Sequence, residues 1–208
     1  MKIIDPAVFI ESTITNEDAI GIIERAGRVC YKSEDKIEEG SAEKFIRGII
    51  NRGHESVIEH VSITVRVICD RGVTHEIVRH RIASYSQESS RYCNYSLDKF
   101  GNELTVIKPF YWNDDSEQYN IWKQCMEESE NAYVKLIKSG ATPQEARSIL
   151  PNSLKTEIFI TMNMREWRHF FNLRCSTTAH PQMQQVANMI LQEFKRRFPL
   201  FVEDIATD

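Results

Sequence analysis

The stretch Val61-Ser62-Ile63-Thr64-Val65-Arg66-Val67-Ile68 alternates apolar and polar side chains from its first residue to Val67. Such alternation is typical of a half-buried β-strand, and β-branched residues favour the pleated surface of a sheet. We therefore predict a strand here. Asp70 or Thr74 is a suitable N-cap for a helix that follows it, and that helix leads into Arg79-His80-Arg81.

Helices and strands are predicted to intermix irregularly along the rest of the chain. Helical spacing of apolar residues predicts helices over 16–28, 41–52, 116–139, 165–174 and 182–198, and short strands are predicted over 104–107 and 157–162. Asn16 and Ser41 are the expected N-caps of the first two helices, and Gly53 is the expected end of the second. Thr142-Pro143-Gln144-Glu145 has the pattern of a capping box ahead of a brief helix over 146–150. This mixture predicts the α+β class.

One apolar stripe stands out on the helix predicted over 116–139. It consists of Tyr119, Trp122, Met126, Tyr133 and Ile137. A stripe at helical spacing packs in a core or a subunit interface far more often than it binds a cofactor. We therefore predict a core or an interface here, and both alternatives stay open.

Composition indicates an ordinary globular chain. The 208 residues are 41% hydrophobic and 27% charged, with a formal net charge of −4. This length suits one domain over 1–208, and no linker or repeat divides it. The five scattered cysteines form no Cys-x-x-Cys pair and are expected to be reduced thiols. No signal peptide or membrane-spanning run is evident, so we expect a cytoplasmic protein.

The stretch from Arg79 to Tyr92 is the densest group of hydrogen-bond donors in the chain. It reads Arg79-His80-Arg81-Ile82-Ala83-Ser84-Tyr85-Ser86-Gln87-Glu88-Ser89-Ser90-Arg91-Tyr92. Arginine binds phosphate or carboxylate in a bidentate way, and hydroxyls and amides orient a polar ligand. A local basic region on an acidic protein favours a small anion over a nucleic-acid backbone. If 87–91 is extended, Gln87, Ser89 and Arg91 point to one side, and Ser86, Glu88 and Ser90 point to the other.

Two other clusters carry less weight. His75 and His80 are five residues apart, whereas the zinc-protease motif needs histidines four apart on one helix face. The zinc reading therefore fails on geometry. On a helix from Arg165, the side chains of Arg168 and His169 share a face with Arg165, and Arg174 lies nearly opposite it. A solvated amphipathic face explains that spacing equally well.

Alternatives from other functional classes remain at this point. A single-stranded RNA-binding module would use arginines on phosphates and Tyr85, Tyr92 and Tyr95 for stacking on bases. The acidic net charge counts against it. A pyrimidine-nucleotide hydrolase would usually need carboxylates for Mg²⁺, and no carboxylate cluster is clear. Cys175 and Ser89 lie near arginines, but neither has a legible base partner as a nucleophile.

Four motifs together resemble a known family. Arg79-His80-Arg81, followed after seven residues by Ser89, resembles the signature of the flavin-dependent thymidylate synthases. The others run from Gly53-His54-Glu55-Ser56 to Glu59-His60, from Ala146-Arg147 to Leu150-Pro151, and from Asn163 to Arg174. Their order and spacing cover nearly the whole chain.

The resemblance implies a fold, a reaction and an assembly. It implies one domain with a central, mainly antiparallel sheet flanked by helices, and reductive methylation of dUMP to dTMP. The carbon would come from methylenetetrahydrofolate and the hydride from FAD reduced by NADPH. It further implies a homotetramer whose active sites combine residues of neighbouring subunits, with no cysteine nucleophile, no metal, no nucleic acid and no membrane.

The resemblance also assigns roles by matching position. FAD contacts would come from Ser56, Arg79, His80, Arg81, Gln87, Asn163, Met164, Arg165 and His169. dUMP contacts would come from Glu76, Ile77, Val78, Arg79, Gln87, Glu88, Ser89, Ser90, Arg91, Arg147 and Arg174. Arg174 would be the catalytic residue, because a fixed cation against the uracil ring favours loss of its N3 proton.

Four positions depart from the family pattern. Cys30 stands where a serine is common, and Glu76 replaces a more usual glutamine. His169 stands where some members have asparagine, and Glu88 where an apolar residue is frequent. These departures bear on single-residue assignments more than on the resemblance as a whole, and the roles of Cys30, Glu76 and Glu88 stay open.

Overall fold

The computed structural model describes residues 1–97 and 101–206, which form two compact units. Unit 1 comprises residues 1–7, 67–79 and 86–158, and unit 2 comprises 8–66, 80–85 and 159–208. The chain passes from one unit to the other inside four strands, so neither unit is a continuous segment of sequence. The single domain over 1–208 stays a prediction.

The main sheet contains the strand that the alternation predicts. Its order is β2 (Ala7–Ile10), β3 (Ser62–Asp70), β6 (Lys155–Asn163) and β4 (Ala83–Gln87). In unit 2 the Met164 N–H donates to the Val61 carbonyl at 2.8 Å, and the Thr64 and Thr161 hydroxyls are 2.9 Å apart. Residue numbers thus rise along β3 as they fall along β6, and the expected α+β fold with an antiparallel sheet is confirmed.

A second, two-stranded sheet lies in unit 1. β1 (Lys2–Ile4) and β5 (Thr105–Ile107) pair in parallel, with Lys2 opposite Thr105. The strand predicted over 104–107 is confirmed within one residue. The sequence analysis missed β1 and β2, because segments of three and four residues are too short to show a periodic pattern.

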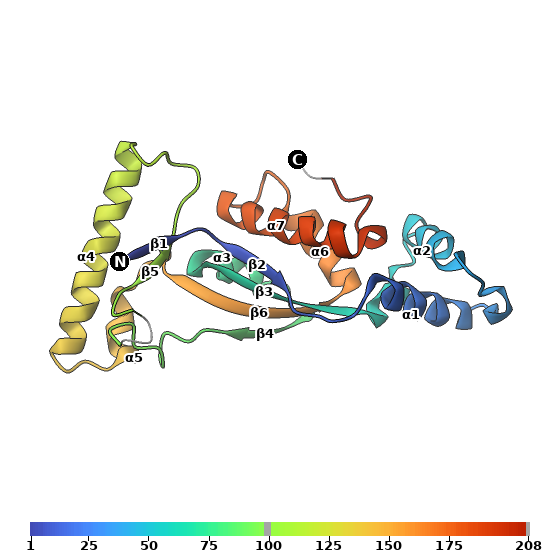
Figure 1. Cartoon of the computed structure of the whole chain (residues 1–208), viewed down its shortest axis with the longest axis horizontal. Coiled ribbons are helices and arrows are strands. Elements are labelled where there is room, and N and C mark those ends of the chain that lie inside the picture. The colour runs from blue at the N-terminus through green and yellow to red at the C-terminus, as the bar shows by residue number, and fades with distance from the viewer. Residues whose placement is uncertain (98–100, 207–208) are drawn as a thin grey trace. The chain divides into compact units, whose positions relative to one another are not determined.

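Aromatic side chains fill the core of unit 2. The helices here are α1 (Asn16–Val29), α2 (Ser41–Asn51), α6 (Met164–Arg174) and α7 (Pro181–Arg197). Trp167 of α6 donates from Nε1 to the Ile63 carbonyl at 3.0 Å, which fixes α6 against β3 (Figure 1). Trp167 stacks on Phe171, and Phe194 of α7 contacts both rings. This packing holds α6 rigidly, which matters because α6 carries several candidate site residues.

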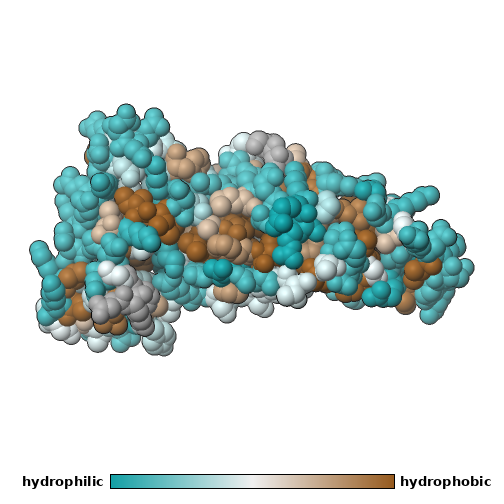
Figure 2. All heavy atoms as spheres, viewed as in Figure 1, coloured by the Kyte–Doolittle hydropathy of each residue, from teal (hydrophilic) through white to brown (hydrophobic). Residues whose placement is uncertain are grey.

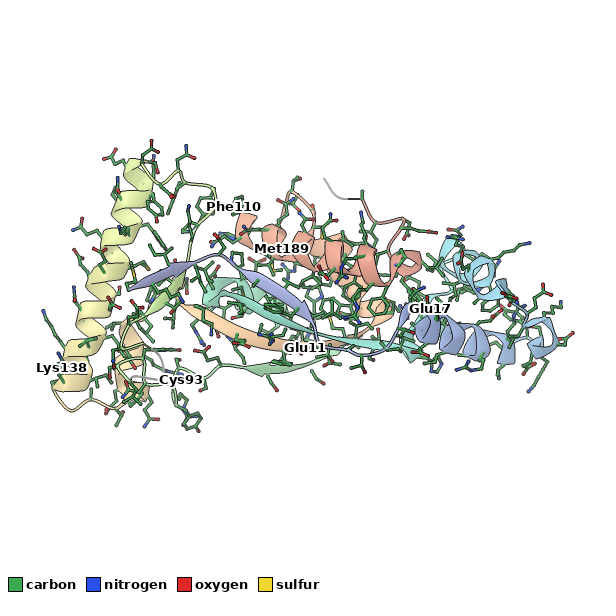
Figure 3. All side chains as sticks on the ribbon, in the orientation of Figure 1. Glu11, Glu17, Cys93, Phe110, Lys138 and Met189 are labelled. Carbon is green, nitrogen blue, oxygen red and sulfur yellow. The ribbon has the colours of Figure 1, made fainter. Side chains whose placement is uncertain are left out.

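The apolar stripe of the long helix forms core in unit 1. This unit contains α3 (Arg71–Ile77), α4 (Glu117–Lys138) and α5 (Pro143–Ala146). Tyr119, Trp122, Met126 and Tyr133 are all buried, and the Trp122 indole donates to the Ser153 hydroxyl at 3.0 Å. The α4 surface in view in Figure 2 is mostly hydrophilic, and α4 ends at Lys138, which Figure 3 labels. Of the two predicted roles for the stripe, core is confirmed.

Helix ends follow the sequence signals with two corrections. Thr15, and not Asn16, caps α1 in a capping box with Asp18. Gly40 precedes α2, and the Ser41 hydroxyl donates to the buried Glu24 carboxylate at 2.7 Å, so Ser41 is not the cap. Asp70, the Thr142 capping box and the end of α2 at Gly53 are confirmed. Both errors are shifts of one residue: Thr15 adjoins Asn16, and Gly40, which adjoins Ser41, makes no side-chain cap hydrogen bond.

Two further features of the described residues bear on function. All five cysteines lie among the described residues and none of them forms a disulfide bond, as predicted. Among the described helices, none has the length and apolar character needed to cross a membrane.

Candidate functional site

The Arg79-His80-Arg81 segment follows the end of a short helix, as predicted. The Asp70 side chain accepts from the Val73 N–H at 2.8 Å and so starts α3, which ends at Ile77. Arg79 and Arg81 are exposed, whereas His80 is 3% exposed. The three residues of the motif therefore have different environments, and the histidine is the structural centre of its neighbourhood.

Both ring nitrogens of His80 take part in polar contacts within unit 2. Nδ1 lies 3.0 Å from Glu166 Oε1, and Nε2 accepts from Arg174 Nε at 3.1 Å. The His80 ring also packs at 5.0 Å from Phe170 and at 5.4 Å from His169, measured between ring centroids. The residues from α6 thus surround the imidazole with one carboxylate, one guanidinium and two rings.

His80 is held in its neutral form. Burial lowers the pKa of His80 below its usual value, and the Arg174 cation acts in the same direction, while Glu166 opposes them. An arginine Nε–H can only donate, so Nε2 must carry the lone pair and Nδ1 the proton. The proton on Nδ1 is therefore donated to Glu166.

His80, Glu166 and His169 also offer ligand atoms within 4.8 Å of one another, close enough for a metal ion. A metal on His80 would have to displace either Glu166 from Nδ1 or Arg174 from Nε2. The adjacent guanidinium would also repel a cation. The geometry therefore describes a hydrogen-bonded cluster better than a metal centre.

A pocket of about 480 Å³ in unit 2 gathers part of the predicted flavin set. Asn163, Arg165 and His169 line it together with Glu59 and Ile82. Asn163 caps α6, since its Oδ1 accepts from the Glu166 N–H at 2.9 Å. Arg165 pairs with Glu59 at 2.7 Å. An amide, an imidazole and a guanidinium on one wall suit a polar aromatic ring, so these residues fit a flavin.

Two other flavin assignments in unit 2 have contrasting environments. Ser56 is exposed on the 3₁₀ helix over Glu55–His60. Met164 is 0% exposed, and its N–H is donated to the Val61 carbonyl at 2.8 Å. Within this chain neither the side chain nor the N–H of Met164 is therefore open to a ligand.

The amide of Gln87 has a fixed orientation in unit 1. Its Nε2 lies 3.1 Å from Thr74 Oγ1 and 3.2 Å from Thr156 Oγ1. The Thr74 hydroxyl donates its only proton to the Arg71 carbonyl at 2.8 Å, so its oxygen must accept from Gln87. Oε1 is consequently the atom that Gln87 can present to a donor on a ligand.

The chain turns from Ser89 onward, so the extended 87–91 segment on which the alternation depended is not formed. β4 ends at Gln87, and the N–H groups of Tyr92 and Cys93 both donate to the Ser89 carbonyl, at 3.1 and 3.0 Å. The Ser89 hydroxyl accepts from the Arg91 N–H at 3.3 Å. Strict alternation of Gln87, Ser89 and Arg91 fails because these local hydrogen bonds curl the chain. Cys93, in the same segment, is labelled in Figure 3.

Glu88 is neutralised within unit 1. Its two oxygens accept from the Tyr95 hydroxyl at 3.0 Å and from Lys155 Nζ at 2.7 Å. These contacts tie the start and the end of the turn to β6. Tyr95 is 5% exposed, so it offers no stacking surface, contrary to the RNA-binding alternative. The Glu88 carboxylate, which departs from the family pattern, therefore has a structural role.

The remaining nucleotide assignments in unit 1 differ in exposure. Ile77 is 0% exposed and Ser90 5%, while Val78 is 40% exposed. Glu76 is half-buried in the last turn of α3, and Arg147 is exposed just after α5. Of these, only Arg147 presents an open cationic side chain.

The polar face predicted for α6 contains a buried arginine. Arg168 is 5% exposed and donates to Glu55 at 2.9 Å and to both Asp204 oxygens at 2.7 Å. Its Nη1 also donates to the Phe201 carbonyl at 2.6 Å. The expectation of a solvated face through Arg165, Arg168 and His169 is thus wrong at Arg168, because its partners come from segments far away in sequence.

Sequence reasoning missed Glu166 and the contact of Tyr85. The Tyr85 hydroxyl donates to the His80 carbonyl at 2.6 Å, and burial raises the pKa of Tyr85 to about 12. Glu166 lies three residues before His169, but no spacing rule pairs it with His80, which is 86 residues away. Only tertiary structure brings these groups together.

The predicted ligand sets divide between the two units. Unit 2 holds the flavin assignments apart from Arg79 and Gln87, and unit 1 holds the nucleotide assignments apart from Arg174. All of these assignments stay predictions.

Comparison with known proteins adds a family and a fold. The family model described as "Thymidylate synthase complementing protein" matches residues 11–200. The flavin-dependent thymidylate synthase of Pyrococcus furiosus is 40% identical over 172 residues, which are 82% of this chain and 70% of that protein. That of Geobacter sulfurreducens is 34% identical over 86% of this chain and 78% of its own.

A solved structure also resembles this chain. It is that of a UMP/dUMP methylase, PolB from Streptomyces cacaoi, bound with 5-Br dUMP. The TM-score is 0.79 over 98% of this chain and 96% of that one, at 22% sequence identity. At this identity the likeness concerns the fold.

Proposed function

The chain belongs to the flavin-dependent thymidylate synthase family, and from that premise we propose that it methylates dUMP reductively to dTMP. The carbon donor is methylenetetrahydrofolate, and the reaction serves the synthesis of pyrimidine deoxynucleotides. The observation that carries the proposal is the placement of Arg174, whose guanidinium is anchored on a buried, neutral histidine.

The substrate is held by the polar groups of unit 1. Arg91 and Arg147 are exposed cations that suit the 5′-phosphate, and Ser89, two residues before Arg91, supplies a hydroxyl. Gln87 presents Oε1, a pure acceptor, to a hydroxyl or N–H of the nucleotide. Charge-assisted hydrogen bonds of this kind contribute roughly 1.5–3 kcal/mol each.

Arg174 acts on the uracil ring. Its positive charge stabilises the anion that forms when N3 loses its proton, and that negative charge makes C5 of the ring a better nucleophile. Such stabilisation is effective when the cation is fixed before the reaction, because no reorganisation is then needed. The side chain is half-buried and comes from the last residue of α6.

FAD, reduced by NADPH, supplies the hydride of the reductive methylation when it is bound. Asn163, Arg165 and His169 would hold the flavin in the pocket that they line, and Arg79, His80, Arg81, Ser56 and Met164 are assigned to it by resemblance. The residues present fit such a ring because amide, imidazole and guanidinium groups converge there. Four copies of the chain assemble, and each site draws on neighbouring subunits.

Absorbance and product analysis test this function directly. The purified protein should be yellow, and its flavin absorbance should bleach when NADPH is added without oxygen. With dUMP and methylenetetrahydrofolate present, chromatography should then detect dTMP. A colourless protein that cannot take up added FAD, or one that consumes NADPH without forming dTMP under these conditions, would contradict the proposal.

A further inference from the structure

We propose that Glu166 is a positioning residue for Arg174 and that it acts through His80. By accepting a hydrogen bond from the Nδ1–H, Glu166 keeps the imidazole in the one neutral tautomer whose Nε2 can accept a hydrogen bond from Arg174. The inference rests on the proposed function, in which Arg174 is the group that acts on the uracil ring.

The hydrogen-bonding capacities of the three groups fix the direction of the chain of contacts. The Nε–H of Arg174 can only donate, and an ionised Glu166 carboxylate can only accept. The distances are 3.1 Å from Arg174 Nε to His80 Nε2 and 3.0 Å from His80 Nδ1 to Glu166 Oε1. Both contacts therefore require the same tautomer, with the proton on Nδ1.

Burial makes this arrangement costly to change. His80 is 3% exposed and Glu166 8%, so water cannot readily replace a lost partner for either group. In the other tautomer, or in the imidazolium, an Nε2–H would face the Arg174 Nε–H. The charged and titratable groups facing the ring, namely Glu166, His169 and Arg174, all come from α6.

Arg174 has a specific need for such an anchor. It is the last residue of α6, and a long arginine side chain loses considerable rotamer freedom when it is held in one position. The contact with His80 uses Nε, and therefore fixes the plane of the guanidinium while its terminal nitrogens extend beyond the anchor. A carboxylate that orients a histidine is a known means of fixing the group that the histidine contacts.

Two substitutions separate a tautomer effect from a loss of charge. Glu166→Ala removes the acceptor for Nδ1, and we expect dTMP formation per bound flavin to fall roughly 10- to 100-fold, by analogy with the loss of groups that orient metal-bound histidines. Glu166→Gln should keep most of the wild-type rate. The amide oxygen of the glutamine can still accept a hydrogen bond from Nδ1–H. We expect this oxygen, and not the NH₂ group, to face the ring, because the contact with Arg174 keeps the lone pair on Nε2 and the proton on Nδ1.

Glu193→Gln is the matched control. Glu193 is a carboxylate on α7 that pairs with the exposed Arg196, three residues along the same helix. The Glu193→Gln variant should form dTMP at the rate of the wild type. Circular dichroism of each variant shows whether the fold is kept, and Glu166→Gln keeps the proposal testable if Glu166→Ala does not fold.

The tautomer itself gives a readout that is independent of activity. Nitrogen-15 NMR of histidine-labelled holoenzyme should show His80 protonated on Nδ1 alone near neutral pH, with its signal identified by its loss in His80→Gln. An Nε2–H tautomer or an imidazolium would overturn the proposal. An unchanged rate of dTMP formation in Glu166→Ala would also overturn it. The same holds if Glu166→Gln loses as much activity as a folded Glu166→Ala variant.

Failure of the proposed function would look different. In that case the wild type itself would form no dTMP, whereas the tautomer of His80 could still be read from the NMR spectrum. If the cluster were instead a metal site, dTMP formation by the wild type would depend on added Zn²⁺ and be lost on chelation. That outcome would also overturn the proposal.

Discussion

At the scale of single residues, Arg174 is the side chain on which the proposed chemistry depends most. From the sequence, the role of Arg174 rests only on the family resemblance. The structure adds that its Nε donates to Nε2 of the buried, neutral His80 at 3.1 Å. A cation that is fixed in advance stabilises a developing anion better than one that must reorganise. The first prediction at this scale concerns that charge.

Arg174→Ala should lower the rate of dTMP formation by roughly 10²- to 10³-fold, as the loss of a preorganised group at a developing charge does. Flavin absorbance should be largely kept, because the residues lining the pocket of unit 2 do not include Arg174. Stopped-flow absorbance and product chromatography measure the two effects. Arg196→Ala, which changes an exposed arginine of α7, is the control and should behave as the wild type.

Loss of FAD with unimpaired binding of dUMP in Arg174→Ala would show that the two ligands had been assigned to the wrong groups.

The Arg174→Ala variant should leave the contacts of Glu88 and Gln87 unchanged. Glu88 is hydrogen-bonded to Lys155 and Tyr95. Gln87 is hydrogen-bonded to Thr74 and Thr156, so we expect both residues to keep the shape of the segment from Gln87 to Arg91 in this variant.

At the scale of elements, α6 is the part of unit 2 on which most functions converge. Its inner face packs Trp167, Phe170 and Phe171 into the aromatic core. Its other faces carry His169 at the pocket, and Glu166 and Arg174 on His80. A buried arginine, Arg168, links it to Glu55 and to Asp204. Rigid placement of the site therefore depends on contacts outside the site.

The link between Arg168 and Asp204 predicts a dependence of stability on pH. Hydrogen bonds from Arg168 hold the pKa of Asp204 below its usual value. A carboxyl with a lowered folded-state pKa stabilises the fold above its unfolded-state pKa of about 3.9, and this contribution is lost as the pH falls through the folded-state value. Urea denaturation at pH 7 and at successively lower pH should show that loss.

Asp204→Asn should remove this contribution. At pH 7 we expect the variant to be destabilised by about 1 kcal/mol, the upper end for a partly exposed ion pair. The difference from the wild type should shrink as the pH is lowered below about 4. Glu43→Gln, which alters an exposed pair with Arg47, should change stability little at any pH. A difference that stays constant with pH in Asp204→Asn would contradict the assignment.

At the scale of the whole molecule, the proposal concerns assembly. Several large apolar side chains are exposed next to candidate site residues, among them Ile82 at 68% and Tyr92 at 76%. Such residues are tolerated singly on a monomer, but they would be covered in an assembly whose sites lie at subunit boundaries. The family resemblance supports four subunits.

Light scattering coupled to size-exclusion chromatography should therefore give four times the chain mass of 24.2 kDa. Ile82→Glu places a charge in a surface expected to be buried between subunits, and should lower the measured mass. Ile121→Glu, on α4, is a control at a similarly exposed position, 61% exposed. A monomeric mass for the FAD-loaded wild type would contradict the proposed assembly.

The predictability of the fold varied with the length of the signal. β3 and the helices over 117–138 and 181–197 were predicted nearly to the residue, because each repeats its periodic pattern several times. β1 and β2 were missed because they are too short for any pattern. The N-caps of α1 and α2 were each predicted one residue too late, because Thr15 adjoins another suitable cap in Asn16 and because the Ser41 hydroxyl is bonded to Glu24.

The sequence by itself determined the α+β class, the family and the residue types that could bind an anion and a flavin. These follow from local periodicity and from motifs that keep their spacing along the chain. Tertiary structure decided which of those residues meet. It joined His80 to Glu166 and Arg174, buried Arg168 among Glu55 and Asp204, and bent the segment after Gln87 into a turn. Contacts between residues dozens of positions apart are set by packing, and no local pattern encodes them.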